Sequence, residues 1–446
     1  MSTNVLGARS PLFLPAGARA FVEPGHIDVM SNMHLMRQIG LIEEISGSDR
    51  GTSTQSDIVT QTTDGVSLDR VWADFQAVLA SYNARRTTMV DFLTYKVTNP
   101  VETVMQATGG DDFEIASEFG VPKGLRTKAS SFQMGFPFEW YDVAGRFTWK
   151  FLIDASAAQV ESIHNSIIEA DNRLVFGEVM RTLFDNTNRA ADINDRPYTV
   201  YAAYNGDGTV PPQYKSTTFP GTHTHYMVSG SLNTDRTANA PVGSGGDAGS
   251  GALISGFHLD ALIKNVTEHG FDAANNSTIV VMLNSAETAR VRNFRNVANL
   301  SAAAAAVKGL NATYDFIPAQ GTPSLLMPRD MIVGTAQQPA NTYQGLKVVG
   351  SYGDALIVEE DYIPSGYAVC FATGGTNSLT NPLGIREHTT PGLRGLRLVK
   401  GRDNDYPLQE SYYQRGFGVG IRQRGSLALM QFKDSGTYAV PTAYAR

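Results

Sequence analysis

A run of aromatic and apolar residues at every second position restricts the fold of this chain more than any other feature. Many of the aromatic and apolar residues from Phe132 through Phe138 to Phe151 are two positions apart, and a period of two is typical of a β-strand. A shorter apolar pattern precedes it over 113–121, and VPKGLRTKASS between them has the character of a turn. We therefore expect a long two-stranded hairpin over 113–151, with arms that reach about 50 Å. Two neighbouring strands of one ordinary sheet are the alternative.

Such a hairpin needs a surface to lie on, because a free two-stranded ribbon of this length is only marginally stable in water. Residues 1–66 have the same need: Pro11, Pro15 and Pro24 interrupt them, and they are expected to form an extended arm. Both segments expose backbone N–H and C=O groups unless another chain pairs with them. The pattern favours a protein that assembles with copies of itself.

The longest predicted helix follows the hairpin directly, over 155–184. Apolar residues keep helical spacing from Val160 to Leu183, and Ser156 with Gln159 forms a capping-box signature. At 1.5 Å per residue this helix would be about 45 Å long, enough for a strut across a domain.

The rest of the chain combines shorter helices with strands. Helices are predicted over 67–83 and over 254–270, the latter ended by Gly270, and a buried strand over 278–283. From Phe316 onward strands dominate, including the sequences ALIVEE, YAVCFAT and LALMQFK. An α+β chain is expected.

Charge and composition exclude several classes of protein. Lys and Arg number 36 against 43 Asp and Glu, a net charge of -7, so the chain lacks the basic balance of a protein that grips many phosphates. Cys370 is the single cysteine, which excludes an intrachain disulfide and a cysteine zinc site and favours a buried apolar role. No apolar run reaches 18 residues, so no membrane span is expected. The P-loop, HExxH, GxSxG and EF-hand motifs are missing, and we expect neither enzymatic activity nor a cofactor.

Two pairs of side chains are candidate ligands. His223 and His225, in GTHTHYM, lie on one strand face and have the chemistry to bind zinc or nickel. No third ligand is visible nearby, so a structural or hydrogen-bonding role is the favoured interpretation and a metal site the weaker one. Arg422 and Arg424 also share a face; a solvated or ion-paired role is favoured over contact with the phosphates or carboxylates of a neighbour.

The order of these parts resembles that of the major capsid proteins of tailed double-stranded DNA phages with the Hong Kong 97 fold. IVEEDYIPSGYAVCFATGG, NPLGIREH, GLRLVKG and YPLQESYYQRGFGVGIRQRG are similar to sequences in capsid proteins of phages that infect actinobacteria, as is VPPQYKSTTFPGTHTHYMVSG. The resemblance implies a Hong Kong 97-type capsid fold with an N-terminal arm, an extended β-hairpin loop, a long spine helix, and peripheral and axial domains. On this chain the parts would be the arm at 1–66, the N-terminal helix and start of the peripheral domain at 67–112, the hairpin loop at 113–151, the spine helix and peripheral domain at 152–277, the axial domain at 278–350, and a strand-rich return at 351–446.

The implied function is mechanical. Hexamers and pentamers of the chain would form the icosahedral shell of the phage head in the host cytoplasm, enclosing DNA without sequence-specific binding. The hairpin would lie over an adjacent subunit, with contacts from Lys123, Arg126, Lys128, Phe136 and Trp140. A separate scaffolding protein is expected, because residues 1–66 contain no long heptad run. A portal and a possible decoration protein complete the implied partners.

Two other functions remain open at this point. An encapsulin-like compartment shell shares the fold, whereas a β-rich hydrolase or carbohydrate-binding protein belongs to a different class. The C-terminal sequences favour the phage capsid. Shells or rings seen by negative-stain electron microscopy would support a phage capsid or an encapsulin-like shell, whereas monomers would support the hydrolase or carbohydrate-binding protein.

Overall fold

The computed structural model describes the chain in two compact units. Unit 1 comprises Met1–Asp74, Ala144–Ser162 and Lys400–Ser411, and unit 2 comprises Phe75–Val143, Ile163–Val399 and Tyr412–Arg446. The residues that the structure describes are 61–84, 88–108, 115–116, 118, 120–121, 128–192, 196–215, 217–234, 252–296, 310–319, 341–343, 346–400 and 408–446. Almost all of the expected arm at 1–66 therefore lies outside the described residues.

The three helices predicted from periodicity are confirmed to within three residues at each end. Helix α6 has 28 residues, about 42 Å at 1.5 Å per residue, and none of the described helices is long and apolar enough to cross a bilayer. The helical segments are α3 (Leu68–Ala84), α4 (Thr88–Leu93), α5 (Trp149–Asp154), α6 (Ala157–Phe184), α7 (Ser229–Thr234), α8 (Gly256–Thr267), α9 (Ser285–Val291) and the 3₁₀ turns η4 (Ala273–Asn275), η7 (Pro391–Leu393) and η8 (Thr442–Tyr444).

Unit 1 contains the start of α6, where polar side chains satisfy free backbone N–H groups. The backbone N–H of Ser156 donates to the side-chain oxygen of Gln159 at 3.0 Å, half of the predicted capping box. The carboxylate of Asp64 accepts from the N–H of Ala157 at 3.1 Å. Hydrogen bonds from Thr62 and Ala157 lower the pKa of Asp64. The helix thus begins where the sequence predicts, with a second cap from a residue 93 positions earlier.

The larger sheet, in unit 2, has eight strands. Its order is β11-β13-β14-β8-β15-β19-β7, and β12 pairs with β13. The central strand β8 runs parallel to β14 and antiparallel to β15. The strands are β7 (Tyr226–Val228), β8 (Thr278–Leu283), β11 (Phe316–Pro318), β12 (Thr342–Tyr343), β13 (Leu346–Tyr352), β14 (Ala355–Glu359), β15 (Tyr367–Thr373) and β19 (Leu427–Gln431).

This sheet is buried on both faces, which explains why its strands have continuous apolar sequences. Val280 and Met282 of β8 face a core that includes α4 and the C-terminal half of α6. Ile279 and Val281, on the opposite face, join a second core with α8 and α9. Cys370 of β15 lies in the second core and is fully buried, as predicted, and burial raises the pKa of its thiol.

The remaining described strands form a five-stranded sheet and three two-stranded sheets. The five-stranded sheet has the order β1-β16-β18-β17, and β4 also pairs with β18. Its strands are β1 (Thr94–Val97), β4 (Glu139–Thr148), β16 (Leu383–Glu387), β17 (Arg397–Lys400) and β18 (Leu408–Ile421). The two-stranded sheets pair β2 (Val101–Thr108) with β3 (Lys128–Gly135), β5 (Arg189–Asp192) with β6 (Pro197–Val200), and β9 (Arg295–Asn296) with β10 (Asn311–Ala312).

The strands of the hairpin differ from the expectation. The outgoing strand is β2, at 101–108, and not the segment 113–121, whose described residues form no strand; Ile115 and Val121 there are more than nine-tenths exposed. The return arm divides at Pro137, which has no N–H for a β-ladder. Residues before it form β3 and residues after it form β4, which belongs to the five-stranded sheet.

His164, on the unit 2 part of α6, makes stability depend on pH. Its ring stacks on Phe75 with centroids 4.0 Å apart and its Nδ1 bonds to the hydroxyl of Tyr413 at 2.8 Å. Burial lowers the pKa of His164 to about 4, against about 6.5 in an unfolded chain. The unfolded chain binds this proton more readily than the folded chain. The contribution of neutral His164 to the free energy of unfolding is therefore complete above pH 6.5 and decreases as the pH falls towards 4.

We expect His164→Gln to weaken this dependence, because glutamine can still hydrogen-bond to Tyr413 but does not titrate. Chemical unfolding of both proteins between pH 7 and pH 4 measures the effect. The loss of stability over this range should be smaller in the variant, and equal slopes would contradict the assignment.

Candidate functional site: the hairpin and the histidine cluster

The hairpin is attached to unit 2 by one face of β3. Met134 and Phe136 join a buried cluster with Tyr95 and Val97, and Phe132 packs edge-on against Tyr201 with ring centroids 5.9 Å apart. On the alternate positions, Ser131 and Gln133 are exposed, whereas Gly135 is buried close to the backbone of Thr199. The predicted alternation is therefore correct for β3 as far as Met134, and there it shows which face of the hairpin lies against the rest of unit 2.

Glycines on β18 allow the segment that joins β3 to β4 to pack directly against the backbone of β18. A Cβ at Gly418 would lie 1.8 Å from the carbonyl oxygen of Pro137, and one at Gly420 would lie 2.8 Å from the ring of Phe136. Gly420 pairs with Gly384 of β16, which the same ring also covers. The sequence signal was the spacing of glycines at 416, 418 and 420, which sequence reasoning missed.

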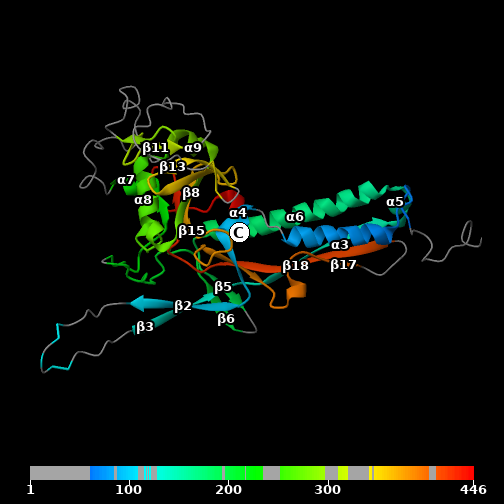
Figure 1. The fold of residues 1–446 in the computed structure, drawn as a ribbon, viewed down its shortest axis with the longest axis horizontal. Helices are drawn as coiled ribbons and strands as arrows, with labels where there is room; N and C mark the ends of the chain where they lie inside the picture. Colours follow the sequence, from blue (N-terminus) through cyan, green and yellow to red (C-terminus); the bar gives the residue numbers. More distant parts are fainter. Residues whose placement is uncertain are drawn as a thin grey trace, which may run out of the picture. The chain divides into compact units, whose positions relative to one another are not determined.

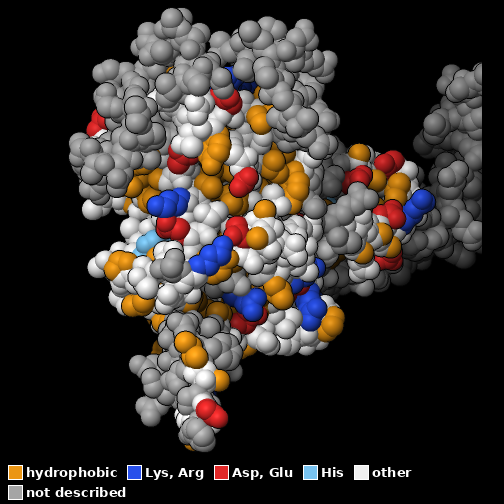
Figure 2. Space-filling model, turned by 60° about the vertical axis from the view of Figure 1, so that its left-hand side comes forward, with side chains coloured by type: hydrophobic (Ala, Val, Ile, Leu, Met, Phe, Trp, Pro, Cys, Tyr) orange, Lys and Arg blue, Asp and Glu red, His pale blue; other side chains and the backbone are white. Residues whose placement is uncertain are grey.

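The arginines singled out in the sequence are both ion-paired within the chain. Arg422 contacts Glu102 of β2 at 2.9 Å, which holds the base of the hairpin. Arg424 is buried and contacts Asp207 at 2.8 Å. The favoured interpretation of this pair is confirmed. Figure 2 likewise shows Lys and Arg side chains lying next to Asp and Glu side chains on the face that it draws.

The predicted contact residues have different environments. Lys123 and Arg126 lie outside the described residues, and Lys128 is the first residue of β3. Trp140 rests against Phe138, with ring centroids 5.4 Å apart, and remains 49% exposed. Phe136 is fully buried within its own subunit, so its side chain is not available to a neighbour and we correct that part of the prediction.

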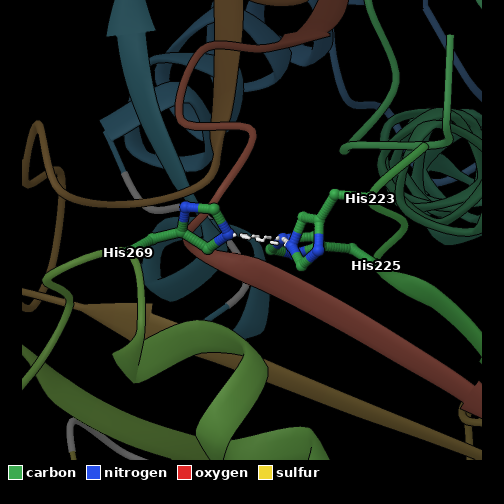
Figure 3. A group of neighbouring side chains, drawn as sticks. All are labelled: His223, His225 and His269. Carbon is green, nitrogen blue, oxygen red and sulfur yellow. Dashed lines mark hydrogen bonds between the residues drawn. The ribbon is translucent and has the colours of Figure 1, made fainter. Parts of the chain in front are cut away.

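Three histidines form a cluster. His223 and His225 were expected from the sequence as a pair, and His269 is a third member that was not expected. The Nε2 atom of His223 lies 3.1 Å from that of His225 and 3.1 Å from that of His269, and the remaining separation is 3.0 Å. Figure 3 shows the rings of His223 and His225 meeting His269 from the opposite side. His269 follows α8, 44 residues beyond His225, and sequence spacing gave no signal for it.

Aromatic rings and burial fix this cluster. The ring of His269 stacks on Phe219, with centroids 4.2 Å apart, and on Tyr204, with centroids 5.4 Å apart. Burial lowers the pKa of His223, lowers that of His225 strongly, and lowers that of His269 to about 3. All three imidazoles are therefore neutral near pH 7, the form that binds metals. Among the described residues, these three are the group of His, Cys, Asp and Glu side chains suited to hold a metal ion.

Comparisons with solved structures place the chain among phage proteins. A chain from Mycobacterium phage Patience is 40% identical over 90% of this chain and 98% of that chain, with a TM-score of 0.66. A chain from the mature capsid of bacteriophage PhiM1 is 10% identical over 79% of this chain and 88% of its own, with a TM-score of 0.43. One from the capsid of cyanophage A-1(L) is 10% identical over 78% and 93%, with a TM-score of 0.40. No family model matches the sequence, and neither does any curated protein.

The similarity to the phage Patience chain carries the assignment, and it defines the class as a structural protein of a phage particle. More particularly, the chain belongs to the major capsid proteins of tailed double-stranded DNA phages with the Hong Kong 97 fold. Its place is the capsid of the virion, where copies form the icosahedral head. The actinobacteriophage resemblance of the sequence is confirmed, and the phage similarity favours this reading over an encapsulin-like shell.

Proposed function

We propose that the β2–β3 hairpin is the principal contact between neighbouring subunits in the shell, and that it takes the role expected of the extended loop. The observation that supports this is the length of its pairing. Among the residues whose side chains the structure describes, the pair of β2 and β3 furthest along the ribbon that packs on the rest of unit 2 is Val104 with Phe132. Pairing continues for four more residues on each strand, to Thr108 opposite Lys128, which is about 14 Å.

The β2–β3 ribbon has backbone edges that no other described strand pairs with. Among the described strands, β2 and β3 pair only with each other, and Figure 1 shows them directed away from β8 and β15. Each strand therefore presents one edge of unpaired backbone groups. A neighbouring subunit under the ribbon would satisfy these groups and stabilise the ribbon.

The side chains proposed to contact that neighbour are Lys123, Arg126, Lys128 and the half-exposed Trp140. Aromatic residues and arginine are enriched where protein surfaces meet, whereas lysine is depleted there, so Arg126 and Trp140 are the stronger candidates of the four. Phe136 has an indirect role in this proposal. Its ring is buried against Gly384 and Gly420, and this packing fixes the direction in which β3 extends from the rest of unit 2.

The other parts keep the roles that the resemblance implies. The helix α6 is the proposed spine, the segments 152–277 and 278–350 carry the peripheral and axial domains, and residues 1–66 clasp a neighbour as the N-terminal arm. Hexamers and pentamers would assemble around a separate scaffolding protein, with a portal at one vertex and a decoration protein as a further partner. The weakly acidic chain, with a net charge of -7, would let packaged DNA slide along the shell, and the chain has no enzymatic role in this proposal.

The test is the assembly state of the full-length chain expressed without other phage proteins. We expect rings of five or six subunits, or closed shells, in negative-stain electron microscopy, and the corresponding species in sedimentation velocity. A chain that stays monomeric at all concentrations and salt conditions would contradict the proposal.

A further inference from the structure

We propose that His223, His225 and His269 form a binding site for a divalent transition-metal ion, and that Zn²⁺ is the ion their chemistry suits best. The site goes beyond the shell function, and it lies in unit 2 outside the hairpin. Three imidazole nitrogens from two segments of the chain converge on one point (Figure 3). Imidazole is a preferred ligand of zinc, copper and nickel.

The tautomer of His225 directs a lone pair into the cluster. Its Nδ1 faces the backbone carbonyl oxygen of Leu427, and a carbonyl oxygen only accepts, so Nδ1 carries the proton and donates it. In a neutral imidazole the other nitrogen is then an unprotonated acceptor. The Nε2 atom of His225 therefore presents a lone pair to His223 and His269, and the carbonyl behind it holds the ring as outer partners of metal-bound histidines do.

Hydrogen bonds alone do not satisfy the three contacts. Each of the other two rings can place at most one proton on Nε2, and the single in-plane lone pair of His225 accepts one of them well. If both Nε2 atoms carry a proton, the N–H groups of His223 and His269 face each other at 3.1 Å. If only one does, the lone pair of the other faces that of His225, so one of the three contacts is unfavourable in either case. One positive ion between three lone pairs resolves this conflict.

The separations agree with a shared ion. Zn–N bonds of about 2.0–2.1 Å in a tetrahedral site set the ligand nitrogens about 3.3 Å apart. The observed separations of 3.0 to 3.1 Å are a few tenths of an ångström shorter, so small ring movements suffice. No fourth His, Cys, Asp or Glu joins the group within the part of the chain that the structure describes, which leaves the fourth position to water.

The surroundings hold the ligands before an ion arrives. Phe219 and Tyr204 stack on His269, and a Cβ at Gly425 would lie 2.8 Å from the same ring. The guanidinium of Arg424, which lies over the ring of Tyr204, is paired with Asp207. His225 is fully buried, whereas His223 and His269 are half-buried, which gives the ion a way in.

An ion here would act as a staple. It would tie the loop before β7 to the end of α8, and the Leu427 contact extends the link to the start of β19. His269 lies 46 residues from His223 and 44 from His225, so the site exists only in the folded chain, and an ion that binds it stabilises the fold by linkage.

The experiment uses shells of the full-length chain, stripped with EDTA, dialysed and titrated with Zn²⁺ alone. We expect about one Zn²⁺ per chain by elemental analysis, and His269→Ala should bind it at least about tenfold more weakly, since loss of even an outer partner of a ligand costs that much. The matched control is His388→Ala, whose ring lies against Phe138 and Trp140 and not in the cluster; it should bind Zn²⁺ like the unaltered chain.

Two readouts keep the test independent of variant folding. Co²⁺ added to the unaltered chain should give the visible absorption of a four-coordinate site, and Zn²⁺ should displace it. At one fixed Zn²⁺ concentration, the melting temperature of the unaltered chain and of His388→Ala should rise more than that of His269→Ala. Failure of the unaltered chain to bind Zn²⁺, or equal binding by His269→Ala, would overturn the site. Shells that assemble normally without metal would leave the proposed function standing.

Discussion

Replacing residues 109–127 with an Asn-Gly turn should leave the subunit folded and prevent most shell assembly. The register permits this design, because Thr108 lies directly opposite Lys128 and Asn-Gly is the preferred two-residue hairpin loop. The packing of β3 through Met134 and Phe136 is unchanged, so the melting temperature of the subunit should stay within a few degrees. Losing about 1.4 kcal/mol from a contact lowers association about tenfold, and a shell repeats each contact many times. We expect at least a tenfold lower yield of intact particles by electron microscopy.

The control is a Gly/Ser segment of unchanged length in place of 109–127. If contacts of Lys123 and Arg126 matter, both variants should assemble poorly, whereas restored assembly in the control would assign the effect to length alone. Normal yields of stable shells in both variants would remove the hairpin from the proposed subunit contact.

The helices and the buried strands were predictable because local patterns determine them. Helix α6 has both a 3.6-residue apolar period and a polar cap at Ser156 and Gln159. Strand β8 lies where a short apolar run predicts it, because both of its faces are buried. In these elements the residues that decide the structure are neighbours in the sequence.

The hairpin was misassigned because the partner of a strand cannot be read from the strand itself. The alternation from Phe132 onward is real, but its true partner, VETVMQAT at 101–108, has a weaker apolar pattern than the segment nearer the turn. In the sequence, only Pro137 indicated that the return arm divides into two strands, because proline cannot donate a backbone hydrogen bond to a β-ladder. The aromatic spacing continues through Pro137 and conceals the division.

The histidine cluster shows the same limit at greater range. His223 and His225 are two residues apart and were recognisable as a pair, but His269 becomes their neighbour only when α8 packs on the eight-stranded sheet. The second core, which includes Leu259 and Leu262 of α8, is what brings this histidine to the cluster. A long-range contact of this kind follows from tertiary packing, not from spacing.

The glycines of β18 give the second large prediction, which tests the junction between the hairpin and the five-stranded sheet. Gly418→Ala should destabilise the subunit by about 3 kcal/mol or more. The added Cβ would lie 1.8 Å from the carbonyl oxygen of Pro137 and 2.5 Å from its carbon. Both are backbone atoms, so no side-chain rotation relieves the contact, and the segment that carries Phe136 must move away from β18. Thermal or urea unfolding of the full-length chain measures the loss.

Gly392→Ala is the matched control, because a Cβ there meets nothing within 4 Å and the residue does not have a positive φ. It should unfold like the unaltered chain. The two variants also separate stability from assembly: moving Phe136 changes the direction of β3, so any Gly418→Ala chain that still folds should assemble poorly. A Gly418→Ala chain as stable as the control and equally able to form shells would show that the close approach of Pro137 to β18 is unimportant for the direction of the hairpin.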